Sequence, residues 1–191
     1  YAATKKSNEL MAHTYSHLYG INTIGLRFFT VYGPWGRPDM ALFKFANSIV
    51  RNQEINVFNQ GNHKRDFTYI DDIIGGIIRI IEKQAMTEKT NAFANQDGQV
   101  KDGQYKIYNI GCGNPVELGR YIMILEQALE TEAKKKFLPM QPGDMLETYA
   151  DITDLVKDFD YYPETSVEDG VRNFADWFLK YYETNPDLEG Y

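Results

Sequence analysis

The sequence predicts an α/β protein built on a largely parallel sheet. Helical periodicity over residues 1–19 ends at Gly20 and is followed at once by an apolar segment rich in β-branched and aromatic residues. Strand-like segments next to amphipathic helices return further along the chain, without any internal repeat. At 191 residues the chain suffices for one domain, or for one domain with a small appendage.

The first half of the chain alternates helices with strands. Apolar residues three and four positions apart predict its helices, and β-branched or aromatic runs between turn residues predict its strands. Asp71 and Asp72 open one of the helices, because carboxylates are favoured near a helix N-terminus. The expected elements are a helix over 1–19, a strand over 21–29, a turn over 33–38, a helix over 40–52, a strand over 54–58, a turn over 59–62 and an extended segment over 66–70.

The second half is less regular. Residues 83–104 are polar and aperiodic, and we interpret them as a surface insertion. A strand is expected at 105–110, and a helix at 116–129 that ends in a charged stretch. The last helix begins at Ser166, where Asp169 three residues later completes a capping box.

The charge of the chain argues against some classes of binding partner. The net charge of −7 and the sequence pI of about 5.0 argue against nucleic-acid and anionic-membrane binding. Residues 1–80 nevertheless hold nine Lys or Arg against six Asp or Glu, whereas the remainder holds eleven against twenty-one. This asymmetry favours a small acidic ligand bound by the first half.

Other features of the sequence bear on its location. Cys112 is the single cysteine, no apolar run approaches the roughly 18 residues of a membrane span, and nothing resembles a secretory leader. We therefore expect the cytoplasm. The chain begins with Tyr rather than Met, so we expect that it is either processed or the latter part of something longer.

Tyr1 and Lys5 form the first candidate for chemistry. They stand four residues apart, on one face of the expected helix, and a nearby ammonium favours the phenolate that can act as a base. Because tyrosine and lysine are both common in this chain, the spacing alone is a weak signal. Its weight comes from the segments that follow.

Four segments keep the order and spacing of a known family. They are residues 25–40 with the turn Gly33-Pro34-Trp35-Gly36-Arg37-Pro38, residues 64–72, Tyr108-Asn109-Ile110-Gly111 with Pro115-Val116-Glu117-Leu118, and residues 138–144. With the Tyr-x-x-x-Lys pair, the chain resembles the extended short-chain dehydrogenase/reductase family. Within that family it is most similar to the nucleotide-sugar epimerases, and among them to UDP-glucuronate 4-epimerases.

The resemblance implies a fold and a cofactor. The fold would be the C-terminal part of a Rossmann-like doubly wound parallel sheet plus a small mixed α/β substrate-binding domain. The cofactor would be NAD, with Tyr1 as the base at the sugar 4-hydroxyl, Lys5 on the nicotinamide ribose and Phe28 beside the nicotinamide. Epimerisation at C4 would then proceed through a 4-keto sugar without net redox change.

The resemblance also implies how a UDP-sugar acid would be bound. Arg37 would read its carboxylate in a two-point fork, with Thr30 either donating to the same carboxylate or closing the strand end. Arg65 would hold the diphosphate, and Lys44 would either assist or remain a solvated lysine. The remaining implied roles are Phe58, either against the uracil or in the core, and Asp144, either at the ribose hydroxyls or within its own turn.

Two departures limit the resemblance. Gln141 stands where UDP-galactose 4-epimerases tend to carry an arginine, although UDP-glucuronate 4-epimerases resemble this chain there. No strand is followed by a complete glycine-rich dinucleotide loop, because Val116 takes the place of the third glycine after Gly111-Cys112-Gly113. We therefore expect that an N-terminal NAD-binding half of roughly 150 residues is absent and that the isolated fragment is inactive.

This expectation gives a division of the chain. A Rossmann-like portion (about 1–30, 66–82 and 105–112) would be interleaved with a UDP-sugar-binding subdomain (about 31–65 and 113–191). The helix at 1–19 would form half of a homodimer interface. His13, His17 and His63 are expected to be surface or helix-packing residues, Cys112 a small buried one, and no metal site is expected.

Three other functions remain open. The chain could be a non-catalytic module that binds a UDP-sugar, since the residues implied for the nucleotide are present while the cofactor loop is not. It could also belong to a UDP-sugar decarboxylase or to a 4-epimerase for a neutral sugar, which share the ketone step. The end product would be a sugar for a capsule or a lipopolysaccharide.

Overall fold

The computed structural model describes residues 1–92 and 103–184, and the chain in it forms two compact units. Unit 1 comprises residues 1–28, 75–110 and 151–162. Unit 2 comprises residues 29–74, 111–150 and 163–191. Each unit is therefore assembled from segments that are distant in sequence.

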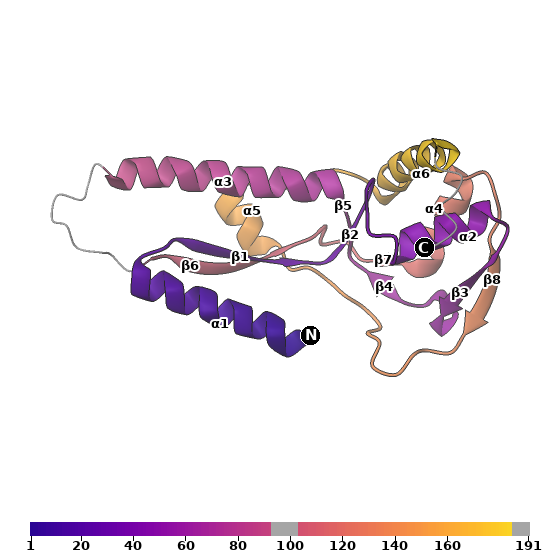
Figure 1. The fold of residues 1–191 in the computed structure, drawn as a ribbon, viewed down its shortest axis with the longest axis horizontal. Helices are drawn as coiled ribbons and strands as arrows, with labels where there is room; N and C mark the ends of the chain where they lie inside the picture. The colour runs from indigo at the N-terminus through magenta and orange to yellow at the C-terminus, as the bar shows by residue number, and fades with distance from the viewer. Residues whose placement is uncertain (93–102, 185–191) are drawn as a thin grey trace. The chain divides into compact units, whose positions relative to one another are not determined.

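Unit 1 is a parallel pair of strands between helices. Strand β1 (Thr23–Phe28) pairs with β6 (Tyr105–Ile110), with Thr23 opposite Tyr105 and Phe28 opposite Ile110. In Figure 1 this pair lies between α1 (Ala2–Tyr19) on one side and α3 (Ile70–Ala92) and α5 (Thr153–Phe159) on the other. The predicted stop at Gly20 is confirmed, because this residue adopts the left-handed conformation with φ of 65°.

Unit 2 contains most of the short elements. They are β2 (Thr30–Tyr32), α2 (Ala41–Val50), β3 (Glu54–Phe58), the 3-10 turn η1 (Asn59–Gly61), β4 (Lys64–Arg65), β5 (Phe67–Tyr69), β7 (Val116–Glu117), α4 (Leu118–Ala128), β8 (Lys134–Leu138) and α6 (Val167–Thr184). Strands β2 and β5 pair in parallel, as do β3 and β8, while β4 and β7 pair antiparallel. The expected α/β class with parallel strand pairing is confirmed.

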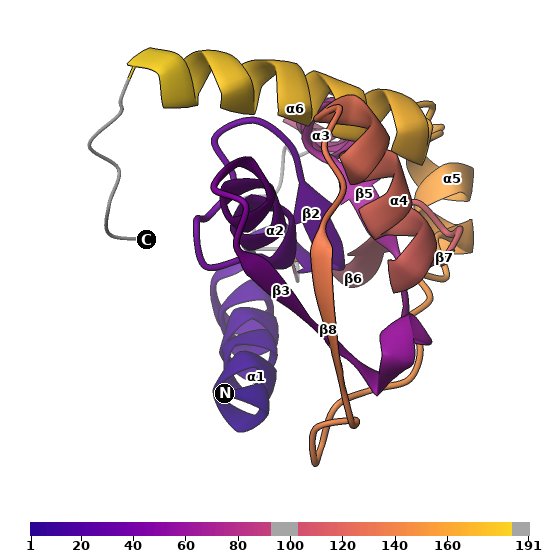
Figure 2. The ribbon, with the colours of Figure 1, turned by 90° about the vertical axis from the view of Figure 1, so that its right-hand side faces the viewer.

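The core of unit 2 is aromatic and aliphatic. Figure 2 shows α6 lying beside α4, and both helices turn apolar faces towards the strands. The rings of Phe67 and Tyr121 stack at 3.9 Å between centroids, and Tyr32 meets both rings edge-on. Ser166 caps α6 as predicted: its hydroxyl accepts from the Asp169 N–H at 3.0 Å and donates to the Asp169 carboxylate at 2.6 Å.

Several elements differ from the prediction. Helix α3 continues to Ala92, so the expected insertion at 83–104 is helical in its first part, and residues 93–102 lie outside the described ones. Val116 and Glu117 form β7 rather than the first turn of a helix, because they pair with Arg65 and Lys64 of β4. Strand β8 and helix α5 were not predicted.

The predicted functions of the two parts of the chain, a Rossmann-like portion and a UDP-sugar-binding subdomain, stay predictions. The compact units differ from its boundaries in two places, since residues 66–74 group with unit 2 and residues 151–162 with unit 1. Within the described residues, no helix combines the length and the apolar character needed to cross a membrane. The described residues also hold no group of three or more His, Cys, Asp or Glu side chains suited to a metal ion.

Substitution by alanine is expected to change the stability of the protein in opposite directions at two helical glycines. A Cβ at Gly170 of α6 would collide with the Tyr32 hydroxyl, whereas a Cβ at Gly75 of α3 meets nothing within 4 Å. Gly170→Ala should lower the free energy of unfolding by about 1–3 kcal/mol through overpacking. Gly75→Ala should raise it by about 0.5–1 kcal/mol. Urea unfolding of both variants checks this, and stabilisation by Gly170→Ala would contradict the packing described.

Candidate functional site

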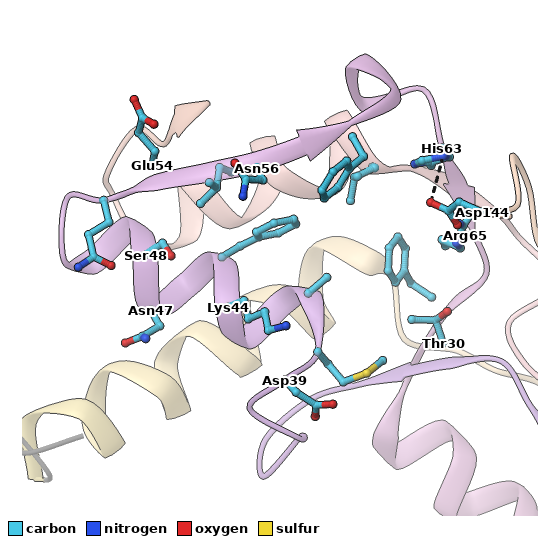
Figure 3. Close-up of a pocket in the computed structure, with 18 residues that line it drawn as sticks. Thr30, Asp39, Lys44, Asn47, Ser48, Glu54, Asn56, His63, Arg65 and Asp144 are labelled. Carbon is cyan, nitrogen blue, oxygen red and sulfur yellow. Dashed lines mark hydrogen bonds and ion pairs between the residues drawn. The ribbon is translucent and has the colours of Figure 1, made fainter. Parts of the chain in front are cut away.

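A cavity of about 700 Å³ lies in unit 2, within the size range of ligand pockets. We call it the first cavity. Figure 3 shows that it is framed by α2 and β3 and by residues of β4 and the turn at Asp144. Five of the six residues predicted to bind substrate line it together, although they come from distant parts of the sequence: Thr30, Lys44, Phe58, Arg65 and Asp144.

One end of the first cavity is charged. The Arg65 guanidinium donates to Asp144 Oδ1 at 2.7 Å and to the Lys64 carbonyl at 3.0 Å. The Nε2 atom of His63 lies 3.4 Å from the other Asp144 oxygen, Oδ2. Figure 3 shows these three side chains gathered at this end. A basic group and a carboxylate held side by side can bind an anion and a hydroxyl group of one ligand.

The opposite end of the first cavity is polar and uncharged except for Glu54. Figure 3 places Asn47 and Ser48 of α2 and Asn56 of β3 there, with Lys44 between the two ends. Phe58, at the end of β3, also lines the cavity and is half-buried. A cavity lined by an apolar ring as well as by amide and hydroxyl groups suits a flat heterocycle that carries hydrogen-bonding edges.

Asp66 organises the backbone behind the charged end. Its side chain is fully buried and accepts hydrogen bonds from the backbone N–H groups of Cys112, Gly113 and Ala150 at 2.8–3.0 Å, and from the Thr68 hydroxyl at 3.1 Å. Asp66 thereby joins three segments of unit 2 beside Arg65. The prediction assigned it no role, although it stands inside a segment that was singled out.

Arg37 is the predicted substrate residue that does not line the first cavity. Its side chain is three-quarters exposed, and the guanidinium forms a two-point contact with Asp39, with Nε donating to Oδ1 at 3.0 Å. Arg37 thereby lowers the pKa of the Asp39 carboxyl. Asp39 does line the cavity. The arginine fork is thus closed on a carboxylate of its own loop, at the border of the cavity.

A second cavity, of about 550 Å³, lies in unit 1 between α1 and β1. It brings together Tyr1, Lys5 and Phe28, which are the three residues predicted for the cofactor. The Lys5 ammonium lies 5.3 Å from the centre of the Tyr1 ring, so the two side chains share one helix face as predicted. The predicted placement of the two side chains on one helix face is therefore confirmed, and their catalytic role stays a prediction.

An ion pair closes the wall of the second cavity. Arg27 of β1 donates to both oxygens of Glu9 at 2.7 and 2.8 Å, and Lys6 donates to Glu9 at 2.7 Å. These contacts, mainly that with Arg27, lower the pKa of Glu9 to about 2. Arg27, the single charge of its strand, therefore ties β1 to α1 and fixes the helix that carries Tyr1 and Lys5.

Two expectations about reactive side chains can be compared with the structure. His63 was expected at the surface or in helix packing, which is wrong: its side chain is 3% exposed and lines the first cavity. Its place between the predicted turn at 59–62 and the segment containing Arg65 was the one sequence signal. Cys112 is half-buried, and burial together with nearby Asp66 raises the pKa of its thiol, which agrees with an unreactive residue.

Comparison with known families matches residues 1–111 of the chain to the family described as NAD dependent epimerase/dehydratase. The chain belongs to this family. The match covers more than half of the chain and includes both residues of the Tyr-x-x-x-Lys pair, which supports the resemblance read from the motifs.

Curated relatives are similar to nearly all of the chain. Protein CapI of Staphylococcus aureus is 56% identical over 96% of this chain and 55% of its own length. UDP-glucuronate 4-epimerase 6 of Arabidopsis thaliana is 44% identical over 99% of this chain and 41% of its own length. The chain thus spans about half the length of these relatives.

A solved structure of similar sequence shares the fold. The crystal structure of UDP-glucuronic acid 4-epimerase from Bacillus cereus, in complex with UDP-glucuronic acid and NAD, matches with a TM-score of 0.78 and 30% identity. The match covers 94% of this chain and 52% of that one. The expected Rossmann-like α/β fold is therefore confirmed.

Proposed function

We propose that this chain supplies the catalytic pair and the substrate cavity of an NAD-dependent epimerase that inverts C4 of a UDP-sugar acid, UDP-glucuronate. The observation that carries the proposal is that the residues predicted for the cofactor and those predicted for the substrate lie in two different cavities. Those assigned to the cofactor line the second cavity, and all but one of those assigned to the substrate line the first. The names of the relatives support the same reaction.

The second cavity suits one end of NAD. It offers an ammonium, a phenol and an aromatic ring that is half exposed, Phe28, which fit a ribose diol and a flat pyridine ring. Lys5 would donate to the ribose hydroxyls and Phe28 would lie against the nicotinamide. When bound, NAD would supply the hydride acceptor that oxidation of a secondary alcohol requires.

Tyr1 would carry the proton transfer. Its phenolate oxygen would take the proton of the sugar 4-hydroxyl and later return it, so that the sugar passes through a ketone and regains a hydroxyl of either configuration. The positive charge of Lys5 on the same helix face favours the phenolate. Because no complete glycine-rich loop stands in these 191 residues, we expect turnover to require the polypeptide that provides one.

The first cavity would hold the nucleotide. Arg65 would bind the diphosphate with guanidinium N–H groups beyond the one given to Asp144, and Lys44 would add a second cation from α2. Phe58 would lie against the uracil, and Asp144 would accept from the ribose hydroxyls. The pyrophosphate and the base would then occupy the charged and the polar ends respectively.

Arg37 would select an acidic sugar by exchanging one carboxylate for another. In the structure Asp39 occupies its fork, and a sugar carboxylate can replace Asp39 with the same two-point geometry. Thr30, which lines the first cavity, would donate its hydroxyl to the same group. A neutral sugar offers Arg37 nothing in exchange for Asp39.

Replacing Arg37 with alanine should therefore reduce the preference for UDP-glucuronate over UDP-glucose. The loss of a charge-assisted pair worth about 1.5–3 kcal/mol corresponds to a loss of roughly 10–100-fold in the ratio of kcat/KM values. The matched control is Arg172→Ala, which breaks an exposed Arg–Asp pair outside both cavities. An unchanged preference in Arg37→Ala would remove Arg37 from the site.

The reaction itself is tested by incubating the protein at its natural length with UDP-glucuronate and NAD and identifying the product by NMR. Formation of UDP-galacturonate supports the proposal. A UDP-pentose with release of carbon dioxide would instead identify a decarboxylase. UDP binding without turnover would favour the binding module, for which the incomplete glycine loop is the specific observation.

We further propose a homodimer through α1 and a cytoplasmic location. The helix exposes a series of large apolar side chains, of which Leu10, Tyr15 and Leu18 are each more than half exposed, while Ser16 is its buried residue. Contiguous exposed apolar residues of this kind commonly mark an interface. A monomeric mass in sedimentation velocity would contradict the dimer.

A further inference from the structure

Trp35 combines two features that a stable loop does not call for. Its backbone has φ of 60°, in the left-handed region, and the residue is 77% exposed. For a bulky residue this conformation is rare and costly, whereas glycine, asparagine and aspartate adopt it more easily. An exposed indole also leaves apolar surface in water. Stability alone would therefore favour a different residue at this position.

The ring of Trp35 has aromatic partners on α6. Its centre lies 5.3 Å from that of Trp177 and 5.5 Å from that of Tyr181, in tilted and edge-on geometry. Trp177 and Tyr181 stack on each other at 5.1 Å, and Trp177 also meets the buried ring of Phe43 on α2 at 6.5 Å. Rings in such arrangements attract one another beyond the effect of their burial. We call Trp35, Trp177 and Tyr181 the aromatic stack.

The aromatic stack joins α6 to the loop that carries Arg37. This loop, residues 33–39, runs from β2 to α2 beneath α6 in Figure 2. Within it the Gly36 N–H donates to the Gly33 carbonyl at 3.2 Å and closes a tight turn around Trp35. This bond shapes the turn but connects the loop to itself. The ring contacts of Trp35 connect the turn to a helix of the core.

The ion pair of Arg37 is internal to the same loop. Its guanidinium contacts Asp39, two residues further along, so the pair moves with the loop. Helix α6 does not, because it packs on α4 and the strands in the core of unit 2. A two-point contact between a guanidinium and a carboxylate depends on the relative placement of two planar groups. The link to α6 therefore bears on how well Arg37 can meet a carboxylate at the border of the first cavity.

We propose that the aromatic stack positions the loop at residues 33–39 and acts, through Arg37, on the choice between an acidic and a neutral sugar. This inference rests on the proposed function, in which Arg37 binds the sugar carboxylate. Neither Trp35 nor Trp177 lines the first or the second cavity, so both are positioning residues. The inference also gives the C-terminal helix of the chain a part in substrate selection.

The test compares Trp35→Asn with Trp35→Phe in the protein at its natural length. Asparagine accepts a left-handed backbone and offers no ring, whereas phenylalanine keeps a ring. Trp35→Asn should melt close to the wild-type temperature, because relief of backbone strain offsets the lost ring contacts. It should nevertheless lower the ratio of kcat/KM for UDP-glucuronate to that for UDP-glucose by about 10-fold, mainly through a higher KM for UDP-glucuronate. Trp35→Phe should keep most of the preference.

A second pair of variants approaches the aromatic stack from α6. Trp177→Leu should lower the same ratio with the loop sequence unchanged, and Trp177→Phe should restore most of it. The matched control is Tyr162→Asn, which removes an exposed ring outside both cavities and should keep the wild-type ratio. Melting curves of all variants show whether they are folded. Should Trp177→Leu not fold, the Trp35 variants still decide.

A double variant tells positioning from any other role of Trp35. A residue that acts through Arg37 has nothing left to position once Arg37 is removed, so Trp35→Asn combined with Arg37→Ala should have the ratio of Arg37→Ala alone. A further loss in the double variant would overturn the inference. Calorimetry with UDP-glucuronate and UDP-glucose on the same variants gives the comparison without relying on rates.

The outcomes separate the inference from the proposed function. If Arg37→Ala loses the preference for UDP-glucuronate and Trp35→Asn keeps it, the inference fails and the proposed function stands. If the wild type shows no such preference, or if Arg37→Ala keeps it, the role of Arg37 in the proposed function fails and the inference fails with it. A preference that is lost in Trp35→Asn, kept in Trp35→Phe and not reduced further in the double variant supports the inference.

Discussion

Tyr1→Phe should reduce the rate of C4 epimerisation by about 10²–10⁴-fold, the usual contribution of a general acid or base. The substitution removes the phenolic oxygen that would take and return the proton and leaves the ring. Tyr1 is 93% exposed, so the fold should not change. Turnover of UDP-glucuronate followed by NMR gives the rate, and calorimetry should give the same affinity for UDP as in the wild type.

A second tyrosine of the same helix provides the control for this result. Tyr15 is also exposed and lies outside both cavities, so Tyr15→Phe should turn over at the wild-type rate. Lys5→Met should also slow the reaction, because the phenolate loses the cation beside it. A Tyr1→Phe variant with the wild-type rate would exclude Tyr1 as the base.

Asp66→Ala should strongly destabilise unit 2. It removes the acceptor of one buried and two part-buried backbone N–H groups, and a buried N–H group left without a partner costs about 1–3 kcal/mol. We expect the free energy of unfolding to fall by at least about 3 kcal/mol, and the midpoint of thermal unfolding by about 6–12 °C. Urea and thermal unfolding followed by circular dichroism measure both quantities.

Two further variants help to explain the expected loss of stability in Asp66→Ala. Asp66→Asn keeps one acceptor oxygen but turns an NH2 group towards N–H donors, so its stability should lie between those of the alanine variant and the wild type. Asp176→Ala removes an exposed carboxylate from α6 and should change the free energy of unfolding by no more than about 0.5 kcal/mol. Equal effects of Asp66→Ala and Asp176→Ala would contradict the buried role of Asp66.

Local patterns predicted the longer elements of the fold. Helices α1 and α2 and strands β1, β3 and β6 follow from periodicity and turn residues, which depend on neighbours in sequence. Strand β8 was not predicted, because its three lysines give it little strand propensity and its partner strand β3 lies some 80 positions away in the sequence. Helix α5 has seven residues, too few for a periodic pattern to stand out.

The residues of the candidate site likewise divide into those that the sequence indicates and those that only the structure reveals. Tyr1, Lys5 and Arg65 stand in segments that the family resemblance singles out. The resemblance assigns His63 and Asp66 no role, because burial and partners give them their properties, and the partners of Asp66 at Cys112, Gly113 and Ala150 lie 46–84 residues further along the chain. Arg37 lies between these cases: the resemblance implies that it binds a carboxylate, which stays a prediction, and the structure shows that its guanidinium contacts Asp39.

The path of the chain constrains how such a protein can change in evolution. It passes back and forth between the two compact units, at residues 28–29, 74–75, 110–111, 150–151 and 162–163, and one of these passages falls within α3. No single cut or fusion point separates one unit from the other, so neither can be exchanged as a cassette between relatives. Substitutions at individual positions can therefore change one unit without exchanging it, whereas a nonsense mutation before residue 163 removes part of both units.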